Sequence, residues 1–223
     1  MGITKQKLSD YSSNKIVGTL DFFDNLEQLQ SIDLQNNLFF GPIPNFTQAS
    51  LKTLGLSNNE LTGAIPNFNQ LPLLNNVLLS GNKFDSIEPT LSNINSINLE
   101  YNILTFEDLE NIEFNSINSV RYSNMDSIPL NFDLELLMNE IVIKLNVDND
   151  VQGSTYTWYK NNELYSTTDV NLLKIDDLQQ GSIWYVEWVN PLFPALTLTS
   201  KKFSLVDYKV NLTGTLFTNT NGS

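Results

Sequence analysis

Apolar residues recur in a fixed order along residues 29–104. Four copies of the same pattern begin at residues 29, 51, 74 and 94, so their steps are 22, 23 and 20 residues. The first, fourth and sixth positions are apolar in every copy: Leu29/Ile32/Leu34, Leu51/Leu54/Leu56, Leu74/Val77/Leu79 and Ile94/Ile97/Leu99. The fourth and sixth positions alternate as in a short strand. This spacing predicts a solenoid in which each coil buries its apolar edge against the next.

Asparagine occupies the ninth position of every copy. The four residues are Asn37, Asn59, Asn82 and Asn102. A side-chain amide both donates and accepts hydrogen bonds, so it can satisfy backbone groups where the chain leaves a strand. Stacked copies are therefore predicted to form a buried asparagine ladder.

A glycine and an Ile-Pro pair follow the asparagine in the first two copies, which read GPIPNF at 41–46 and GAIPNF at 63–68. Together with the period, these residues resemble the leucine-rich repeat family. The Gly-x-Ile-Pro form is similar to repeats common in plant receptor ectodomains and secreted bacterial surface proteins. The resemblance covers roughly half the chain and implies a solenoid whose strands line a concave binding face.

Residues 3–23 are predicted to form an incomplete first coil. Asn14 holds the position of Asn37, whereas Ser9 stands where the next coil has Ile32. An open solenoid end exposes apolar surface, so a weak terminal repeat leads us to expect further chain upstream.

From about Val120 the apolar period changes to two. Ile141, Ile143, Leu145 and Val147 share one face, as expected for a strand of a β-sandwich. Further strands are predicted at 155–160, 172–175, 184–189, 196–199 and 202–210, with a hairpin turn at residues 161–162. The order of short strands predicts a sandwich of about seven strands.

The segment TYTWYKNNELY resembles the tryptophan strand of immunoglobulin-like domains, which implies that Trp158 is the buried indole. DDLQQGSIWY is similar to the turn into their sixth strand, with Tyr185 as a candidate tyrosine corner. Both cysteines of that family's disulfide are absent. Strand 184–189 has apolar residues on both faces, so its register stays open: Trp184 and Trp188 are either core residues or an exposed platform for sugars.

The fold class expected is mainly β, with a short leucine-rich repeat solenoid followed by an immunoglobulin-like β-sandwich. The solenoid is predicted at 1–118, in four to five coils that end in a helical segment over 106–114. The sandwich is predicted at 119–210, and the Asn/Thr/Gly-rich residues 211–223 are expected to be a linker or the start of another module. This order of modules resembles repeat proteins secreted by Bacteroidetes-type bacteria.

Composition closes off several function classes. Twelve basic and twenty-five acidic residues give a net charge of −13, which argues against a nucleic-acid partner, because such binding depends on Lys and Arg. The sequence contains no histidine and no cysteine, so Ser-His-Asp and Cys-His catalysis and thiolate or imidazole metal sites are excluded. No apolar run reaches membrane-spanning length, so we expect no membrane insertion.

The remaining candidate chemistry is weak. Asp148–Gly153 has the alternating oxygens of a calcium loop, but the twelfth position is Tyr159 where the motif needs glutamate. The carboxylates of Asp176, Asp177 and 107–113 have no predicted separation, so they are read as a solvated turn and a capping segment. We therefore expect no enzyme activity, no metal and no cofactor.

The concave face of the repeats is the remaining candidate site. Polar residues between the buried leucines project there, and a rigid row of directed polar groups suits recognition of a protein or glycan. The binding residues predicted are Asp33, Gln35, Ser57, Asn76, Leu78, Asn98 and Glu100.

The sequence thus predicts a non-catalytic binding or adhesion module, secreted or at the cell surface, in a monomeric fragment of a longer chain. Two alternatives stay open: a structural spacer, or a carbohydrate-binding accessory of a larger secreted protein.

Overall fold

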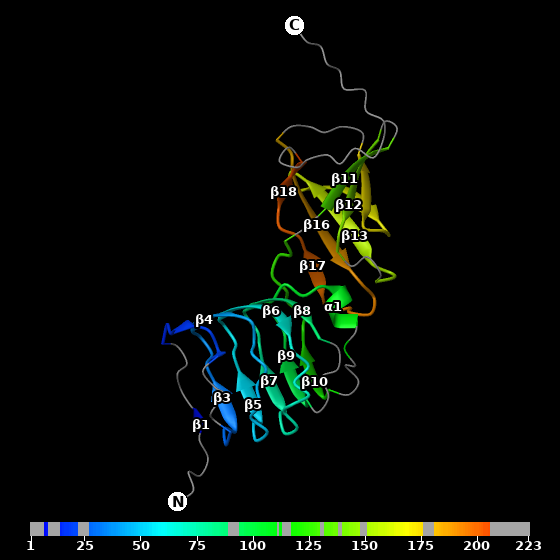
Figure 1. The fold of residues 1–223 in the computed structure, drawn as a ribbon. Helices are drawn as coiled ribbons and strands as arrows, with labels where there is room; N and C mark the ends of the chain where they lie inside the picture. The colour runs from blue at the N-terminus through cyan, green and yellow to red at the C-terminus, as the bar shows by residue number, and fades with distance from the viewer. Residues whose placement is uncertain are drawn as a thin grey trace, which may run out of the picture. The chain divides into compact units, whose positions relative to one another are not determined.

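The computed structural model describes residues 7–8, 14–21, 27–88, 94–110, 112, 117–129, 132–137, 140–147, 151–175 and 181–205. The chain divides into two compact units, Met1–Asp126 and Ser127–Ser223. Figure 1 shows the elements of each unit.

The first unit carries a six-stranded parallel sheet on one side of its coils (Figure 1). Its strands, in spatial order, are β1 (Lys7–Leu8), β3 (Ser31–Asp33), β5 (Thr53–Gly55), β7 (Asn76–Leu78), β9 (Ser96–Asn98) and β10 (Ser119–Arg121). Each coil therefore contributes one strand, as the period near 22 residues predicts.

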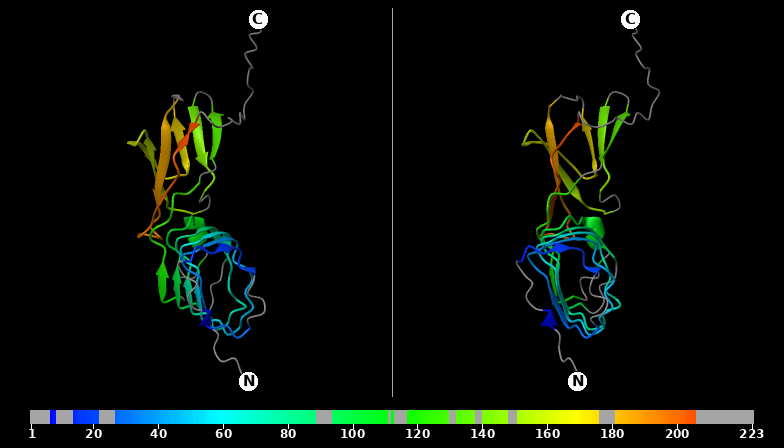
Figure 2. Two further views of the ribbon diagram at one scale, coloured as in Figure 1. Left: turned by 90° about the vertical axis from the view of Figure 1, so that its left-hand side faces the viewer. Right: turned by 60° about the vertical axis from the view of Figure 1, so that its left-hand side comes forward.

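A second, four-stranded parallel sheet lies on another side of the same coils, which Figure 2 shows nearly end on. It consists of β2 (Val17–Gly18), β4 (Leu38–Gly41), β6 (Glu60–Ile65) and β8 (Lys83–Ile87). In the coil after β9, helix α1 (Phe106–Glu110) takes the place of such a strand and buries Phe106 and Leu109. The helical segment predicted around 106–114 is confirmed over these five residues.

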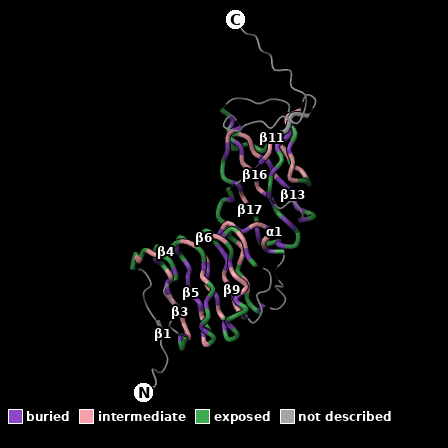
Figure 3. Tube along the Cα trace, viewed as in Figure 1, coloured by how far each residue is buried: buried purple, intermediate pink, exposed green. Residues whose placement is uncertain are grey.

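The apolar positions of the repeats form the core between the two sheets. All twelve first, fourth and sixth positions predicted from the sequence are at most 3% exposed. Figure 3 shows these buried residues alternating with half-buried ones along the strands. Burial of that kind stabilises each coil through its neighbours, because a single coil has no core of its own.

The asparagine ladder is confirmed. Asn59 donates its amide to the carbonyl of Leu34 in the preceding coil at 3.0 Å and to that of Leu56 at 2.9 Å. Its Oδ1 accepts the backbone N–H of Phe39 at 3.0 Å. Asn82 and Asn102 make equivalent bonds, and Asn37 donates to the carbonyl of Leu34 and accepts the N–H of Ile16. All four side chains are buried.

The first coil has a different register from the prediction. β1 pairs with β3 so that Leu8 lies opposite Ile32, where Ser9 was expected. That alignment is wrong by one residue. Leu8 precedes Asn14 by six positions, whereas Ile32 precedes Asn37 by five, so the first coil holds one additional residue between strand and turn.

A further repeat, the fifth when the copies are counted from Leu29 and called the fifth coil below, begins at Ile117, which is buried and lies 23 residues after Ile94. Its strand β10 pairs in parallel with β9, placing Val120 opposite Ile97. The strand therefore extends the solenoid sheet, although the module change was expected at residue 119. The ninth position of this coil is Met125, so the coil lacks the asparagine that identifies the others.

The second unit contains two antiparallel sheets. One has the order β11 (Phe132–Leu137), β12 (Glu140–Leu145), β15 (Leu172–Ile175). The other has the order β14 (Glu163–Thr168), β13 (Thr155–Lys160), β16 (Ile183–Val189), β17 (Thr197–Thr199), and β18 (Phe203–Ser204) also pairs with β16. Phe132 and Phe203, from different sheets, bring their rings to 4.7 Å.

Buried side chains settle the register that the sequence left open. Trp184, Val186 and Trp188 are at most 1% exposed, whereas Ile183 and Val189 on the other face of β16 are 42% and 45% exposed. Trp184 and Trp188 are therefore core residues, and their reading as an exposed sugar platform is wrong. The face of β16 with the two tryptophans is the buried one, because burying these large side chains removes more apolar surface from water than burying Ile183 and Val189 would.

The predicted core face is confirmed for Ile143 and Leu145 of β12 and for Val147 just after it, whereas Ile141 is half-buried; Val142 on the other face of β12 is also buried. The hairpin turn is confirmed at Asn161 and Asn162, whose φ angles of 53° and 67° suit a tight turn between strands. Strand β11 was not predicted. Residues 148–150 of the candidate calcium loop Asp148–Gly153, the Asp176-Asp177 pair and residues 206–223 lie outside the described residues.

In the described part of the chain, no helix combines the length and the apolar character needed to cross a membrane.

Candidate binding face

The side chains that project outward from the six-stranded sheet form one surface, which we call the sheet face. All seven predicted binding residues lie on strands β3, β7 and β9 or within two residues of the ends of β3, β5 and β9. The strand pairing aligns a central row across the coils: Asp33, Gly55, Leu78, Asn98 and Arg121. Neighbouring positions of such a row are about 4.8 Å apart.

A second row runs beside the central one and contains Ser31, Thr53, Asn76, Ser96 and Ser119. Asn76 is half-buried, as are the first, second and fourth members of this row. The row is uncharged and made of hydrogen-bonding groups, which recognise polar surfaces without a strong charge preference.

Asp33 and Gln35 interact at the N-terminal side of the face. Asp33 Oδ1 accepts the Gln35 amide at 3.0 Å and the Gln35 backbone N–H at 3.4 Å. Both side chains lean over Gly55: a Cβ there would stand 3.3 Å from Asp33 Oδ1 and from Gln35 Nε2. The missing side chain of Gly55 thus leaves room for this polar pair.

Ser57 and Asn98 are tied into the scaffold. Ser57 is buried, and its hydroxyl accepts a hydrogen bond from Ser80 Oγ at 3.1 Å. Asn98 is half-buried and accepts the backbone N–H of Glu100 at 3.1 Å. Of these two, only Asn98 presents part of its side chain to solvent.

Glu100 is buried, although it was predicted as a surface carboxylate. Its Oε1 accepts the Ser123 hydroxyl at 2.8 Å and the Asn124 amide at 3.2 Å. Its Oε2 pairs with Arg121 Nη2 at 2.8 Å, where the Glu100 side chain is 6% exposed and that of Arg121 is 65% exposed. Glu100 therefore fixes the fifth coil and orients the arginine, with little surface left for a partner.

Two exposed residues of this region were missed. Arg121 belongs to the fifth repeat. This repeat begins with Ile-Asn-Ser at 117–119, as the fourth does at 94–96, and this match in the sequence could have revealed it. Tyr101 is 52% exposed and has a φ of 57°, in the left-handed region that few residues other than Gly and Asn adopt. The equivalent residues in three other coils, Asn36, Asn58 and Gly81, share this conformation, so the repeat geometry imposes it on the tyrosine.

The central row of the face offers hydrogen-bonding groups, one aliphatic side chain and two opposite charges. Asp33 and Arg121 lie at opposite ends of the central row, with half-buried Leu78 between them. Among the residues described, no three His, Cys, Asp or Glu side chains gather where they would hold a metal ion.

Comparisons with known proteins agree with the repeat pattern of the first unit. The Leucine Rich Repeat family model matches residues 28–49 and 50–71, whereas no curated protein matches the chain. Among solved structures, the ectodomain of the receptor kinase SOBIR1 from Arabidopsis thaliana is 21% identical, with a TM-score of 0.42 over 52% of this chain and 70% of that one.

Two bacterial structures are also similar. InlP of Listeria monocytogenes is 17% identical, with a TM-score of 0.40 over 82% of this chain and 68% of that one. The internalin-like protein lmo2027 of the same organism is 20% identical, with a TM-score of 0.42 over 82% and 67%. Residues 28–71 thus match leucine-rich repeats, a fold typical of protein-binding modules.

Proposed function

We propose that the first unit is a non-catalytic protein-binding module that acts through its sheet face. The observation that supports this most directly is the central row, in which Asp33, Leu78, Asn98 and Arg121 stand at regular spacing on strands locked by a buried core. Binding groups held on a rigid scaffold lose little conformational entropy when a partner docks.

The anchor of this surface is its C-terminal part. Arg121 is held by Glu100, and Tyr101 exposes about half of its side chain next to that carboxylate in the sequence. Tyrosine and arginine are enriched among the residues that dominate protein interfaces. In this proposal Glu100 positions Arg121, while Asp33, Gln35, Asn76, Leu78 and Asn98 contact the partner.

The partner has charges that complement the row: an acidic group for Arg121 and a basic group for Asp33. Such a contact steers the encounter and weakens as salt screens it. A neutral glycan would respond little to salt, which separates the two ligand classes.

We also propose the cellular setting and the nature of the second unit. The Gly-x-Ile-Pro repeats support a secreted or surface-attached protein, and the molecule acts as a monomer. Two antiparallel sheets and the buried Trp158 support an immunoglobulin-like sandwich that presents the first unit.

The experiment measures binding of the fluorescently labelled chain to intact eukaryotic and bacterial cells, and to a glycan array. The face variant is Leu78→Asp/Arg121→Ala. The matched control, Thr62→Asp/Lys83→Ala, makes the same charge changes at exposed residues of β6 and β8.

We expect saturable binding to at least one cell type that disappears when the cells are treated with protease. The face variant should bind at least about tenfold more weakly, the loss expected for a central interface residue, and the control should bind normally. Equal binding by the face variant contradicts the proposal. Protease-resistant binding with a positive glycan array points to a glycan ligand. Absence of binding to both the cells and the array supports the structural spacer.

A further inference from the structure

The second unit has two sheet edges that border one groove. In the described part of the chain, β14 pairs only with β13, and β15 pairs only with β12. Each strand therefore has one edge whose backbone N–H and C=O groups have no strand partner there. Such an edge is a template for another extended chain.

The part of β14 from Ser166 to Thr168 lacks the features that usually prevent pairing, whereas Tyr165 just before it has no register partner on β13. The residues of β14, Glu163 to Thr168, include no proline and no lysine. The irregularity in its pairing with β13 falls between Trp158 and Tyr159, so the part of the strand from Ser166 to Thr168 has regular register. An edge blunted by lysine, proline or a bulge rejects an incoming strand, and this portion has none of them.

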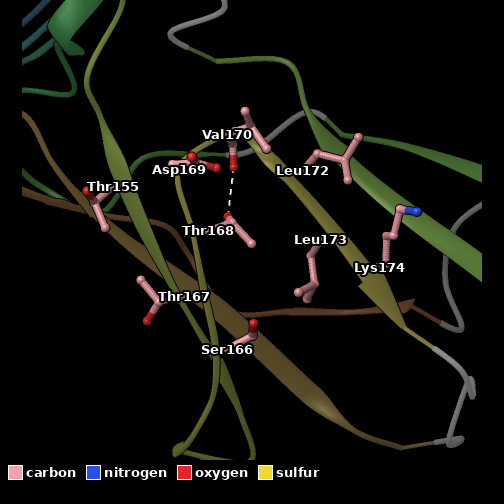
Figure 4. A pocket seen from close by; sticks show the side chains of 9 residues that line it. All are labelled: Thr155, Ser166, Thr167, Thr168, Asp169, Val170, Leu172, Leu173 and Lys174. Carbon is pink, nitrogen blue, oxygen red and sulfur yellow. Dashed lines mark hydrogen bonds between the residues drawn. The ribbon is translucent and has the colours of Figure 1, made fainter.

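The groove lies between this portion of β14 and the strand β15 (Figure 4). Its volume is about 560 Å³. Ser166, Thr167 and Thr168 supply hydroxyl groups from β14, and Leu172 and Leu173 supply an apolar wall from β15. An extended peptide presents its main chain to one side and alternate side chains to another, which suits a wall of each kind.

Hydrogen bonds fix the end of the groove. Trp158 Nε1 donates to Thr168 Oγ1 at 3.0 Å, and the Thr168 hydroxyl donates to the carbonyl of Val170 at 2.7 Å, as Figure 4 shows for the second bond. The Asn171 amide donates to the carbonyl of Leu145 on β12 at 3.0 Å. The link between β14 and β15 is thus anchored to both sheets before any ligand binds.

Most charged side chains near the groove have an oppositely charged neighbour. Lys174 on its wall pairs with Glu140 at 2.8 Å, and Glu163 lies opposite Lys160 in the strand register. Asp169, which is exposed, makes no ion pair among the described residues. Asp169 thus places an exposed carboxylate without an ion-pair partner in the described residues at one end of the groove, while Lys144 lies opposite Leu172 in the strand register.

We propose that this groove binds an extended peptide, which adds to β14 as a further strand and places a lysine or arginine beside Asp169. The site is independent of the sheet face of the first unit. Main-chain hydrogen bonds supply the attraction, Leu172 and Leu173 select apolar alternate side chains, and Asp169 sets the direction of the peptide.

The test uses the full chain and capped hexapeptides of alternating threonine and valine with one terminal lysine, placed at either end. Each peptide is compared with three control peptides. One has glutamine in place of lysine, one has alternate backbone nitrogens methylated, and one is a scrambled peptide of the same charge. Titration calorimetry gives the affinity, and amide chemical shifts of the labelled chain give the location.

Binding of one lysine peptide, with shifts centred on residues 166–168, is the expected result. Thr167→Lys should weaken it at least about tenfold by placing a charge on the edge. The matched control Thr197→Lys, an exposed residue of the opposite edge strand β17, should bind within about twofold of the unaltered chain. Asp169→Asn should weaken the lysine peptide and leave the glutamine peptide unchanged.

Four results would overturn the proposal: no binding of either lysine peptide, full binding by Thr167→Lys, equal binding of the methylated peptide, or shifts located outside the groove. An unchanged affinity of Asp169→Asn for the lysine peptide would show that Asp169 does not bind the lysine of the peptide. Loss of binding in both lysine variants would identify a nonspecific charge effect and equally reject the groove.

Discussion

The guanidinium of Arg121 and the carboxylate of Glu100 form an ion pair at 2.8 Å across two successive coils. The same carboxylate accepts hydrogen bonds from Ser123 and Asn124, so three groups of the fifth coil depend on one residue of the fourth. Glu100 thereby joins the stability of the C-terminal coil to the geometry of the sheet face.

Glu100→Gln should destabilise the first unit by about 1–3 kcal/mol, because it removes a charged acceptor from buried surroundings. The exposed arginine side of the pair keeps the cost below that of a fully buried ion pair. Urea unfolding measures the change. Glu60→Gln is the control, since Glu60 pairs with Lys83 on the surface and such pairs contribute about 0–1 kcal/mol. Equal costs for both variants would show that Glu100 does not fasten the fifth coil.

Asn59→Ala should lower the unfolding free energy by about 1–3 kcal/mol, because it leaves the buried Phe39 N–H without its acceptor and removes one of the two amide donors to the Leu34 carbonyl. Asn75→Ala, at an exposed residue of the next coil, should change it by less than about 0.5 kcal/mol. Thermal and urea unfolding both report the difference. A similarly small effect in the two variants would show that the asparagine ladder does not stabilise the first unit.

The repeat pattern predicted the core of the first unit because a solenoid makes every coil obey the same spacing. Leu54 and Val77 are buried for the same reason, and reading one coil explains the others. The fifth coil escaped prediction where this rule weakens: Met125 replaces the asparagine, and no Gly-x-Ile-Pro segment follows.

The binding face was predictable only as a set of positions. Position along a strand says that Glu100 and Asn98 point to the same side, but the burial of Glu100 depends on Arg121, Ser123 and Asn124 in a later coil. The register of β16 was undetermined for a related reason: both faces of this strand are apolar, and the packing of Trp188 decides between them.

Trp158→Ala should destabilise the second unit by about 3–5 kcal/mol, because the indole is fully buried and its loss leaves a cavity. Trp158→Phe should cost less and keep the unit folded, which allows the comparison if the alanine variant unfolds. Leu164→Ala, at a residue 66% exposed on the adjacent strand, is the control with little expected effect. Chemical unfolding followed by near-ultraviolet circular dichroism gives the values. A folded, unaltered Trp158→Ala protein would disprove the core assignment.

Tyr159 should ionise above pH 10.0. The hydrogen bond from its hydroxyl to Glu187 Oε2 at 3.1 Å, desolvation, and the negative charge of Glu187 raise the pKa of Tyr159 from its ordinary value of 10.0. Because the folded state holds this proton more tightly, the stabilisation is complete below pH 10.0 and is lost as pH rises through the folded-state pKa.

Phenolate absorbance during an alkaline titration measures this ionisation, and Tyr159→Phe identifies its contribution to the signal. Glu187→Gln should return the pKa of Tyr159 toward 10.0 because it removes the charge and weakens the acceptor. An unchanged titration of Tyr159 in Glu187→Gln would show that Glu187 is not the cause.

Protein binding through the sheet face is tested most directly by blocking that face with a bulky group. The chain contains no cysteine, so one introduced thiol is a unique attachment point. Ser96→Cys lies on β9 within the sheet face, and Ser86→Cys lies on β8 of the other sheet with the same half-buried exposure. Each variant is measured for cell binding before and after coupling to a polyethylene glycol maleimide. The account predicts that coupling abolishes binding at Ser96→Cys and leaves it intact at Ser86→Cys, whereas full binding by the coupled Ser96→Cys protein would contradict it.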